Sequence, residues 1–367
     1  MLKDINIENF RNFNNAELHF APNLNIILGQ NGVGKSNLLE AAYLCGLGKT
    51  FRGHNQVLVR IDQQFAKIAA DSEDRNEVEI VLLPGGERNI TFNDKKVPRI
   101  SQLLGKFPMT YIGPEEVMLV AGAPSLRRAI LDTHLCQFDT EYVSHLSHYQ
   151  RSIRQRNAAL RGVASHTMAG GMVLIDSWDE KVAKSGSAVT ATRIDFLQKL
   201  SPIATEIFSA IAGEGIFALN MKYRSTALEN PDVSDFENKF YEKLAQRRKL
   251  DLIRFDTSIG PHRDDIEIHL GNFDARHFAS WGQIRMISLA MYLASVKILS
   301  EHTQHTPTIL LDDALAELDP VRSRAALDFF PQIGQALVAT PHPEQVRDIT
   351  GAKHFIFSAP GVVLEKT

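Results

Sequence analysis

The residues with the clearest chemistry lie in a glycine-rich segment, Gly29–Ser36, which reads Gly-Gln-Asn-Gly-Val-Gly-Lys-Ser. Its spacing, Gly-x4-Gly-Lys-Ser, is typical of a phosphate-binding loop, whose backbone N–H groups surround the α and β phosphates of a nucleotide. In such a loop Lys35 reaches the β and γ phosphates, and the Ser36 hydroxyl ligates Mg²⁺. The residues predicted to bind ATP are Gly29, Gln30, Asn31, Gly32, Val33, Gly34, Lys35, Ser36 and Asn37.

Two consecutive acids follow the apolar run Pro307–Leu311, which predicts a buried strand. A magnesium-dependent nucleotidase needs such acids beside its phosphate loop. Asp312 would hold Mg²⁺ through water, and Asp313 would orient and deprotonate the attacking water, so Lys35 and Asp313 are the predicted catalytic residues. The alternative is a capped turn after a strand, and the phosphate loop earlier in the chain favours the metal site.

A third segment, Ser280-Trp281-Gly282-Gln283, opens a strongly apolar predicted helix. A helix start presents unpaired N–H groups and a positive dipole end, which can bind a γ-phosphate. The alternative is that Ser280 is an ordinary N-cap. The order of the motifs favours the phosphate role: a phosphate loop, Ser-x-Gly-Gln at a helix start, a strand with Asp-Asp, and Glu317-Leu318-Asp319 downstream.

The elements around the loop match what such a loop requires. Residues 24–28 predict a buried strand, and residues 37–47 carry apolar side chains at helical spacing. A glycine-rich turn that carries Lys-Ser by accident would not need these flanks. Further alternating segments predict short strands that add an antiparallel sheet to a parallel nucleotide-binding sheet; they lie at 5–7, 18–20, 57–61, 65–70, 77–83 and 89–92.

Helical spacing dominates from about residue 125 to 250, with loop-like composition at 162–171 and 230–234. Strand character returns afterwards at 266–270, 308–311 and 336–339, with an apolar helix at 283–299. These last elements are expected to complete the sheet begun before the loop. The expected class is α/β, with a helical lobe inserted into the first domain.

Composition describes an ordinary globular chain of 367 residues, long enough for about two domains. The formal net charge is −3, so a nucleic-acid partner would have to bind local basic patches. Cys45 and Cys136 lack metal-ligand spacing and are expected to be core thiols in a reducing compartment. No export segment or membrane span is evident, so a cytoplasmic location is expected.

The ordered motifs are the signature of ATP-binding-cassette ATPases, and their details resemble the RecF family of bacterial recombinational repair. The resemblance covers residues 1 to about 345 and rests on 9–12, 49–52, 114–116, 124–132, 260–265 and 280–283. It departs from the usual pattern at Trp281, where a small or basic residue is more common. Asp313 replaces the Glu of most transport ATPases, although an Asp-Asp pair is typical of RecF-like chains.

The resemblance implies an ABC-type ATPase head at 1–122 and 251–367, with a helical lobe at 123–250. It implies ATP and Mg²⁺ as cofactors and a homodimer in which Ser280, Gly282 and Gln283 of one subunit contact the nucleotide on the other. It also implies slow, DNA-stimulated ATP hydrolysis, recombinase loading with RecR and RecO, and support of the SOS damage response. The roles of Arg52, His262, Arg263, Thr340 and His342 stay open.

Arginines are concentrated in the predicted lobe and indicate where single-stranded or gapped DNA would bind. No acidic residue occurs between Glu141 and Asp176, and a second basic cluster runs from Lys239 to Lys249. Clustered cations bind DNA because each neutralised phosphate releases a counterion. A solvated helix face is the alternative. The predicted DNA-binding residues are Arg151, Arg154, Arg161, Arg247 and Arg248.

Two other classes remain open at this stage. The ATPase subunit of a transporter would use the same motifs, although the helical insert with its arginines argues against it. A P-loop kinase or GTPase that does not act on DNA is the other class. It would make the Ser-x-Gly-Gln segment a coincidence, and the sequence lacks the Asn-Lys-x-Asp guanine motif.

Overall fold

The computed structural model describes residues 1–52, 58–165, 171–213, 217–228, 235–303, 305–316, 318–346, 349 and 351–366. The chain forms two compact units, each of which draws on separate parts of the sequence. Unit 1 comprises Met1–Val117, Ala204–Ile216 and Ser280–Thr367, and unit 2 comprises Met118–Ile203 and Phe217–Ala279. Among the described residues, no helix combines the length and apolar composition needed to cross a membrane.

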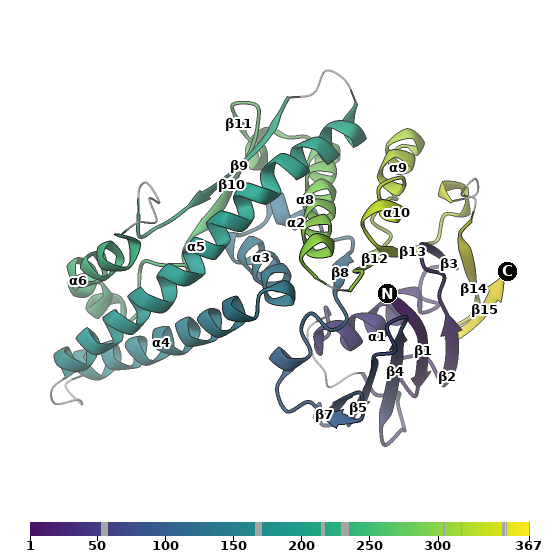
Figure 1. Ribbon diagram of the computed structural model, residues 1–367, viewed down its shortest axis with the longest axis horizontal. Helices are drawn as coiled ribbons and strands as arrows, with labels where there is room; N and C mark the ends of the chain where they lie inside the picture. The colour runs from purple at the N-terminus through teal and green to yellow at the C-terminus, as the bar shows by residue number, and fades with distance from the viewer. Residues whose placement is uncertain are drawn as a thin grey trace. The chain divides into compact units, whose positions relative to one another are not determined.

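A mixed six-stranded sheet positions the predicted nucleotide site in unit 1 (Figure 1). Its central strands are buried along almost their whole length, as both faces of a parallel sheet are covered. Of the strand pairs in this sheet, only the one at the edge formed by the last strand in the sequence is antiparallel. In spatial order the strands are β15 (Val362–Lys366), β14 (Lys353–Ala359), β3 (Leu24–Leu28), β13 (Gln335–Thr340), β12 (Thr308–Asp312) and β8 (Met109–Ile112).

An antiparallel sheet forms the second layer of unit 1. Its strands alternate buried and exposed residues, so one face packs on the core and the other meets water. In spatial order they are β2 (Asn15–His19), β1 (Leu2–Glu8), β4 (Ala66–Ser72), β5 (Glu77–Leu82), β6 (Arg88–Phe92) and β7 (Lys95–Lys96).

Helix α1 (Lys35–Leu47) joins the two sheets of unit 1. It contacts β8, β12 and β13 of the mixed sheet and β4 and β5 of the antiparallel sheet. The helix is therefore buried on nearly every side, and Leu38, Leu39 and Leu44 are fully inaccessible to solvent. A shared core of side chains from both sheets and this helix holds the first turn of α1 in place.

In the described part of the chain, three further helices of unit 1 follow unit 2 in the sequence. The long helix α8 (Trp281–His302) is buried from Ile284 to Val296 and contacts β8. The two short helices are α9 (Pro320–Leu327) and α10 (Phe330–Ile333), and α10 contacts α8 and β13.

Unit 2 combines helices with a small antiparallel sheet. The sheet has the order β11 (Phe273–Asp274), β10 (Asp265–Leu270) and β9 (Leu219–Arg224). Arg156, in the helix α4 (Thr140–Ala164), is fully buried in this unit, where it donates to Asp179 and Asp251 at 2.5 and 2.7 Å. The helices are α2 (Met118–Ala121), α3 (Pro124–Phe138), α4 (Thr140–Ala164), α5 (Gly171–Ala212, whose last residues cluster with unit 1), α6 (Phe236–Arg254) and α7 (Ala275–Phe278).

The structure differs from the sequence-based expectation in four places. The predicted strand at 266–270 does not complete the nucleotide sheet, because β10 pairs with β9 in unit 2. For the same reason unit 2 extends to Ala279, whereas the prediction returned to the head at 251. In the predicted strand 57–61, Val59 makes only one isolated bridge, to Phe10, and Val57 lies outside the described residues. The strands β8, β9, β14 and β15 carry too weak a pattern to be predicted.

The structure confirms other predicted helices and strands of unit 1. The helices expected at 37–47 and 283–299 are confirmed as α1 and α8, and the strands at 24–28, 308–311 and 336–339 are confirmed as β3, β12 and β13. Cys45 is buried and Cys136 is half-buried, and neither forms a disulfide. The predicted loop 230–234, residues 166–170 of the loop 162–171, and Glu317 lie outside the described residues.

Candidate nucleotide-binding site

The glycine-rich loop connects the end of β3 to the first residue of α1, as the sequence predicts. Gly32 and Gly34 have φ angles of 84° and 115°, a region that side chains other than glycine rarely adopt. A Cβ at Gly34 would also lie 2.4 Å from the Asn12 Nδ2 atom. The loop therefore needs glycine both for its turn and for its contact with the neighbouring segment.

Lys35, the first residue of α1, points back into the curve of the loop. Its ammonium group donates to the backbone carbonyls of Gly29 and Gln30 at 2.7 and 3.0 Å. Only 7% of the residue is exposed, and burial lowers the pKa of Lys35, while Asp312 and Asp313 act in the opposite direction. The Lys35 ammonium group therefore lies inside the loop, where the backbone amides would bind phosphate oxygens.

Asn12 braces the loop from the turn that follows β1, a role that motif analysis did not identify. Its Nδ2 atom donates to the Val33 carbonyl at 2.7 Å, and its Oδ1 atom accepts from Asn37 Nδ2 at 2.8 Å. Asn37, a predicted ATP contact, also accepts from Arg52 at 2.7 Å. The segment 9–12 resembles the corresponding segment of the family, but its spacing alone signals no such contact.

Ser36 and Asp312 meet at the predicted metal position. The Ser36 hydroxyl donates to Asp312 Oδ1 at 2.8 Å, although 276 positions separate the two residues in the sequence. A hydroxyl and a carboxylate are the hard oxygen donors that Mg²⁺ prefers, and Mg²⁺ is usually bound by few protein groups plus substrate phosphates. Within the described residues no group of three or more His, Cys, Asp or Glu side chains could hold a metal by itself. This donor set fits Mg²⁺ bound together with a nucleotide.

Asp313 occupies a strained position directly after Asp312, the predicted metal ligand. Its φ angle is 56°, in the left-handed region that Asp and Asn tolerate better than larger residues, and its N–H donates to the Ala339 carbonyl at 2.9 Å. Its Oδ1 atom is buried and has no hydrogen-bond partner in the described part of the chain. Burial raises the pKa of Asp313, opposed by His342 and helped by Asp312. An unpaired carboxylate of this kind is suited to accept a proton from water.

Thr340 and His342, whose roles the sequence leaves open, lie at and just beyond the end of β13, which pairs with both β3 and β12. The Thr340 hydroxyl accepts from the His342 N–H at 3.1 Å and lies 3.2 Å from Gln345 Oε1. His342 Nδ1 lies 3.1 Å from Glu344 Oε1. Both residues therefore already have protein partners.

The start of α8 is an open surface of unit 1. Ser280, Trp281 and Gly282 are exposed, and a Cβ at Gly282 would have no atom within 4 Å. Ser280 is also a true N-cap, because its hydroxyl accepts from the Gln283 N–H at 3.3 Å while Gln283 Oε1 accepts from the Ser280 N–H at 2.8 Å. In the described residues no hydrogen bond joins this segment to the phosphate loop of the same chain.

The exposed start of α8 sits on a well-anchored helix. Arg285, one turn further, lies 3.3 Å from Glu116, which follows β8. Both side chains are almost fully buried. The segment Ser280–Gln283 is therefore held rigidly at the surface instead of being folded into its own core.

The predicted DNA-binding arginines divide into two groups. Arg151, Arg154 and Arg161 of α4 and Arg247 of α6 are exposed. Arg248 differs from the prediction, because its side chain is only 17% exposed and forms ion pairs with Asp176 and Asp179 of α5. Asp179 lies 69 positions away from Arg248, so local spacing carries no sign of this pairing.

His262 and Arg263 have structural partners within unit 2. The His262 ring lies 2.5 Å from the Tyr149 hydroxyl and 2.9 Å from the Thr257 carbonyl. Burial lowers the pKa of His262, which favours its neutral form. Arg263 pairs with Asp256. These contacts favour the interpretation of the Gly260–Asp265 run as a braced bend.

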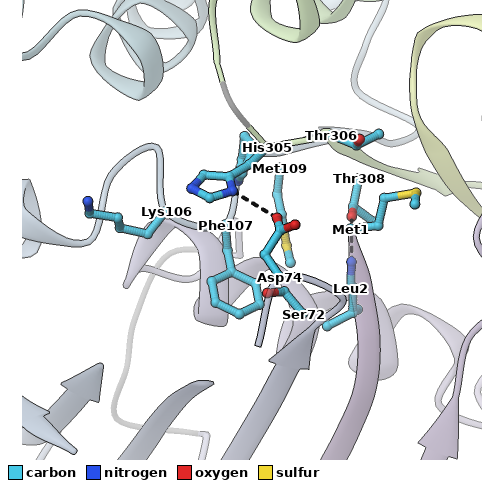
Figure 2. A pocket seen from close by; sticks show the side chains of 11 residues that line it. Met1, Leu2, Ser72, Asp74, Lys106, Phe107, Met109, His305, Thr306 and Thr308 are labelled. Atoms are coloured by element: carbon cyan, nitrogen blue, oxygen red, sulfur yellow. Dashed lines mark hydrogen bonds and ion pairs between the residues drawn. The ribbon is translucent and has the colours of Figure 1, made fainter. Parts of the chain in front are cut away.

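A hollow lies at the other end of β12, beside Thr308 (Figure 2). His305 Nδ1 lies 2.9 Å from Asp74 there, and Phe107 and Met109 form part of the wall. The space measures about 10 Å³, which is room for about one water molecule. The hollow is therefore too small for a nucleotide and separate from Asp312.

Comparison with known proteins agrees with the geometry of the site. The family model of the RecF/RecN/SMC N terminal domain matches residues 1–358. The DNA replication and repair protein RecF of Clostridium perfringens is 32% identical over 343 residues, which cover 92% of each chain.

Solved structures extend this similarity to the fold. A structure of the recombination mediator protein RecF with ATP, in the RecFOR pathway, has a TM-score of 0.89 and 29% identity and covers 100% of this chain and 97% of that chain. An Smc head domain from Pyrococcus furiosus has a TM-score of 0.60 at 14% identity, covers 100% of this chain and 96% of that chain, and is similar in fold alone. The predicted fold class and family resemblance are confirmed.

Proposed function

We propose that this chain, which belongs to the RecF family within the group of RecF, RecN and SMC N-terminal domains, is an ATP-dependent DNA-binding protein of replication and recombinational repair. The convergence of Lys35, Ser36, Asp312 and Asp313 at the end of the mixed sheet carries the proposal. We assign unit 1 as the ATPase head and unit 2 as the inserted lobe. ATP binds on the loop, Mg²⁺ binds at Ser36 and Asp312, and Asp313 activates water.

The nucleotide acts as a switch because a single chain contacts ATP from one side, through its loop and its acids, and a second copy of the chain contacts it from the other side. The loop and the acids bind ATP and Mg²⁺, while Ser280 and Gly282 lie exposed at the start of α8 without a hydrogen bond to their own loop, as far as the structure is described. A helix start stabilises the γ-phosphate charge, which ADP lacks. The exposed segment therefore closes over the ATP of a second copy, and hydrolysis releases it.

The nucleotide-dependent dimer is tested by sedimentation of the purified chain. With ATP and Mg²⁺ the particle should have about twice the 41.0 kDa mass of one chain, and with ADP it should have the mass of the monomer. The Gly282→Glu variant is the matched control. Its added side chain has room on the surface but places a negative charge facing the γ-phosphate, so it should remain monomeric with either nucleotide. Equal masses of the wild-type chain in ATP and ADP would contradict the switch.

DNA binding is assigned to the exposed arginines of α4. Arg151, Arg154 and Arg161 are exposed, and Arg247 of α6 is a further exposed cation in unit 2. These side chains would contact phosphates without reading sequence, which suits a protein that acts at damaged replication sites. Arg248 is removed from this surface because its guanidinium is paired with two aspartates.

The arginine surface is tested by a gel shift on gapped and single-stranded DNA at several salt concentrations. The double variant Arg151→Ala with Arg154→Ala should weaken ATP-dependent binding and make the salt dependence shallower by about two phosphate contacts. The control Lys95→Ala with Lys96→Ala removes two exposed charges from unit 1 and should leave binding unchanged. An unchanged salt slope in the arginine variant would remove α4 from the interface. Equal DNA binding of the wild-type chain with ATP and with ADP would contradict the nucleotide switch, and absent DNA binding would favour a role away from DNA.

Family membership supports the finer biological roles that we propose. DNA stimulates the slow ATP hydrolysis, the ATP-bound dimer marks gapped or single-stranded DNA, and RecR and RecO act with it in recombinase loading and SOS induction. One structure of RecF with ATP is described as belonging to the RecFOR pathway, which supports this set of partners. A pull-down of RecR with the chain in ATP and in ADP tests the partner assignment.

A further inference from the structure

Tyr111 of β8 lies beside the carboxylate that the proposed site assigns to the metal. The β8–β12 register pairs Tyr111 with Leu310, so the tyrosine side chain shares a face of the sheet with Leu310 and Asp312. The Tyr111 hydroxyl donates to Asp312 Oδ2 at 3.1 Å, while Ser36 donates to Asp312 Oδ1 at 2.8 Å. Each oxygen of Asp312 thus has its own donor, and the plane of the carboxylate is fixed.

The tyrosine ring is held from several sides. It stacks on Phe51 with the ring centres 3.7 Å apart and an angle of 12°, and Tyr43 meets it edge-on at 6.1 Å. A Cβ at Gly113 would lie 2.2 Å from the Tyr111 hydroxyl, so the phenol can occupy this position only because residue 113 is glycine. The hydroxyl is therefore positioned as rigidly as the carboxylate that it contacts.

The same stack connects Asp312 with the loop after α1. The Arg52 guanidinium lies 5.5 Å from the centre of the Phe51 ring and donates to Asn37. A displacement of Tyr111 would therefore reach both the metal carboxylate and a predicted ATP contact. The chain from Asn37 to Asp312 runs through side chains of unit 1 only.

We propose that Tyr111 is a positioning residue of the metal site, whose hydroxyl holds Asp312 in the orientation in which this carboxylate takes part in binding the Mg²⁺ of the nucleotide. The inference rests on the proposed function, since it needs a Mg²⁺–ATP site at Ser36 and Asp312. When bound, Mg²⁺ neutralises charge on the β and γ phosphates. A tyrosine hydroxyl can donate one hydrogen bond, and here it donates to Asp312 Oδ2.

The test is a Mg²⁺ titration of the binding of a fluorescent ATP analogue to the Tyr111→Phe variant. This change removes the hydroxyl and keeps the stacked ring. The Mg²⁺ concentration at half-saturation should rise about tenfold, as is typical when a group that orients a metal ligand is lost. Binding of the analogue in EDTA should not change, because the loop contacts are intact.

Two further variants make the result specific. Tyr43→Phe removes a hydroxyl from the same ring cluster without touching Asp312 and should keep the wild-type Mg²⁺ dependence. Gly113→Ala, which displaces the Tyr111 phenol, should shift the titration in the same direction as Tyr111→Phe.

The outcomes separate this inference from the function on which it rests. If the wild-type chain shows Mg²⁺-dependent ATP binding and Tyr111→Phe gives the same titration, the positioning role is wrong and the proposed function stands. If the wild-type chain itself binds no ATP with Mg²⁺, the proposed function and this inference both fall.

Discussion

Replacing Asp313 by Asn should slow ATP hydrolysis by about two to four orders of magnitude, the usual loss when a general base is removed. ATP binding should persist, because Lys35, Ser36 and Asp312 are unchanged, and the dimer should accumulate with ATP. The reason is local. Asp313 Oδ1 is buried without a hydrogen-bond partner in the described residues, and its pKa is raised by burial. Single-turnover phosphate release measures the rate, and sedimentation measures the trapped dimer.

The Asp313→Asn substitution isolates the chemistry from the fold. Asn tolerates the φ angle of 56° at this position, which Ala or Glu would strain. A carboxyl whose pKa is raised in the folded chain costs stability when it is charged, so stability is lost as the pH rises through that pKa. The amide side chain of the variant carries no charge, and the variant should be at least as stable as the wild type at neutral pH. Hydrolysis within a few-fold of the wild-type rate would exclude Asp313 as the base.

Replacing Lys35 by Ala should weaken ATP binding about tenfold to a hundredfold, since hydrogen bonds to charged groups contribute about 1.5–3 kcal/mol. Hydrolysis should be lost with it, because the γ-phosphate loses its cation in the loop. Titration with a fluorescent ATP analogue measures the affinity, and sedimentation in ATP should find only the monomer. An affinity equal to that of the wild type would place the nucleotide elsewhere.

The motifs of the site could be predicted because each is local in sequence. The phosphate loop, the Asp-Asp pair and the Ser-x-Gly-Gln segment each occupy fewer than ten consecutive residues, and the strand and helix flanks fix where they point. The apolar runs of β3, β12 and β13 indicate a buried parallel sheet for the same reason. Fold class and the ends of the site strands were therefore accessible from the sequence.

The groups that support these motifs could not be predicted, because sheet pairing brings them in from elsewhere. Tyr111 lies on a strand of four residues whose pattern is too short to recognise, and 201 positions separate it from Asp312. Asn12 acts on the loop across 21 positions. Neither contact leaves a mark on local spacing.

The limits of pattern analysis also explain the errors. The alternation in β10 indicates a strand with one buried face, but it does not say which sheet the strand joins. Arg248 belongs to a basic run in the sequence, and only the fold places Asp176 and Asp179 against it. Charge counts along a helix cannot distinguish a free cation from one held by a distant partner.

The central claim is that one ATP is bound by two copies of the chain, and mixing two inactive variants tests it most directly. Lys35→Ala disables the phosphate loop. Gly282→Glu disables only the start of α8, which contacts the nucleotide of the other copy, and Gly282 is exposed with open space around it. A negative residue in the first turn of a helix is also favourable for folding. The matched control is a mixture of Lys35→Ala with Asp313→Asn. Both changes lie on the side of the site formed by the loop and the acids, so no dimer of these two variants has a complete site.

Each variant alone should hydrolyse almost no ATP. Neither variant should form a homodimer, so the dimers in an equal mixture of Lys35→Ala and Gly282→Glu are mixed ones. Each mixed dimer has one complete site of its two, so up to about half of wild-type hydrolysis should return. The mixture of Lys35→Ala with Asp313→Asn should stay inactive. If the first mixture is no more active than its two components measured separately, the nucleotide is not shared between copies and the account is contradicted.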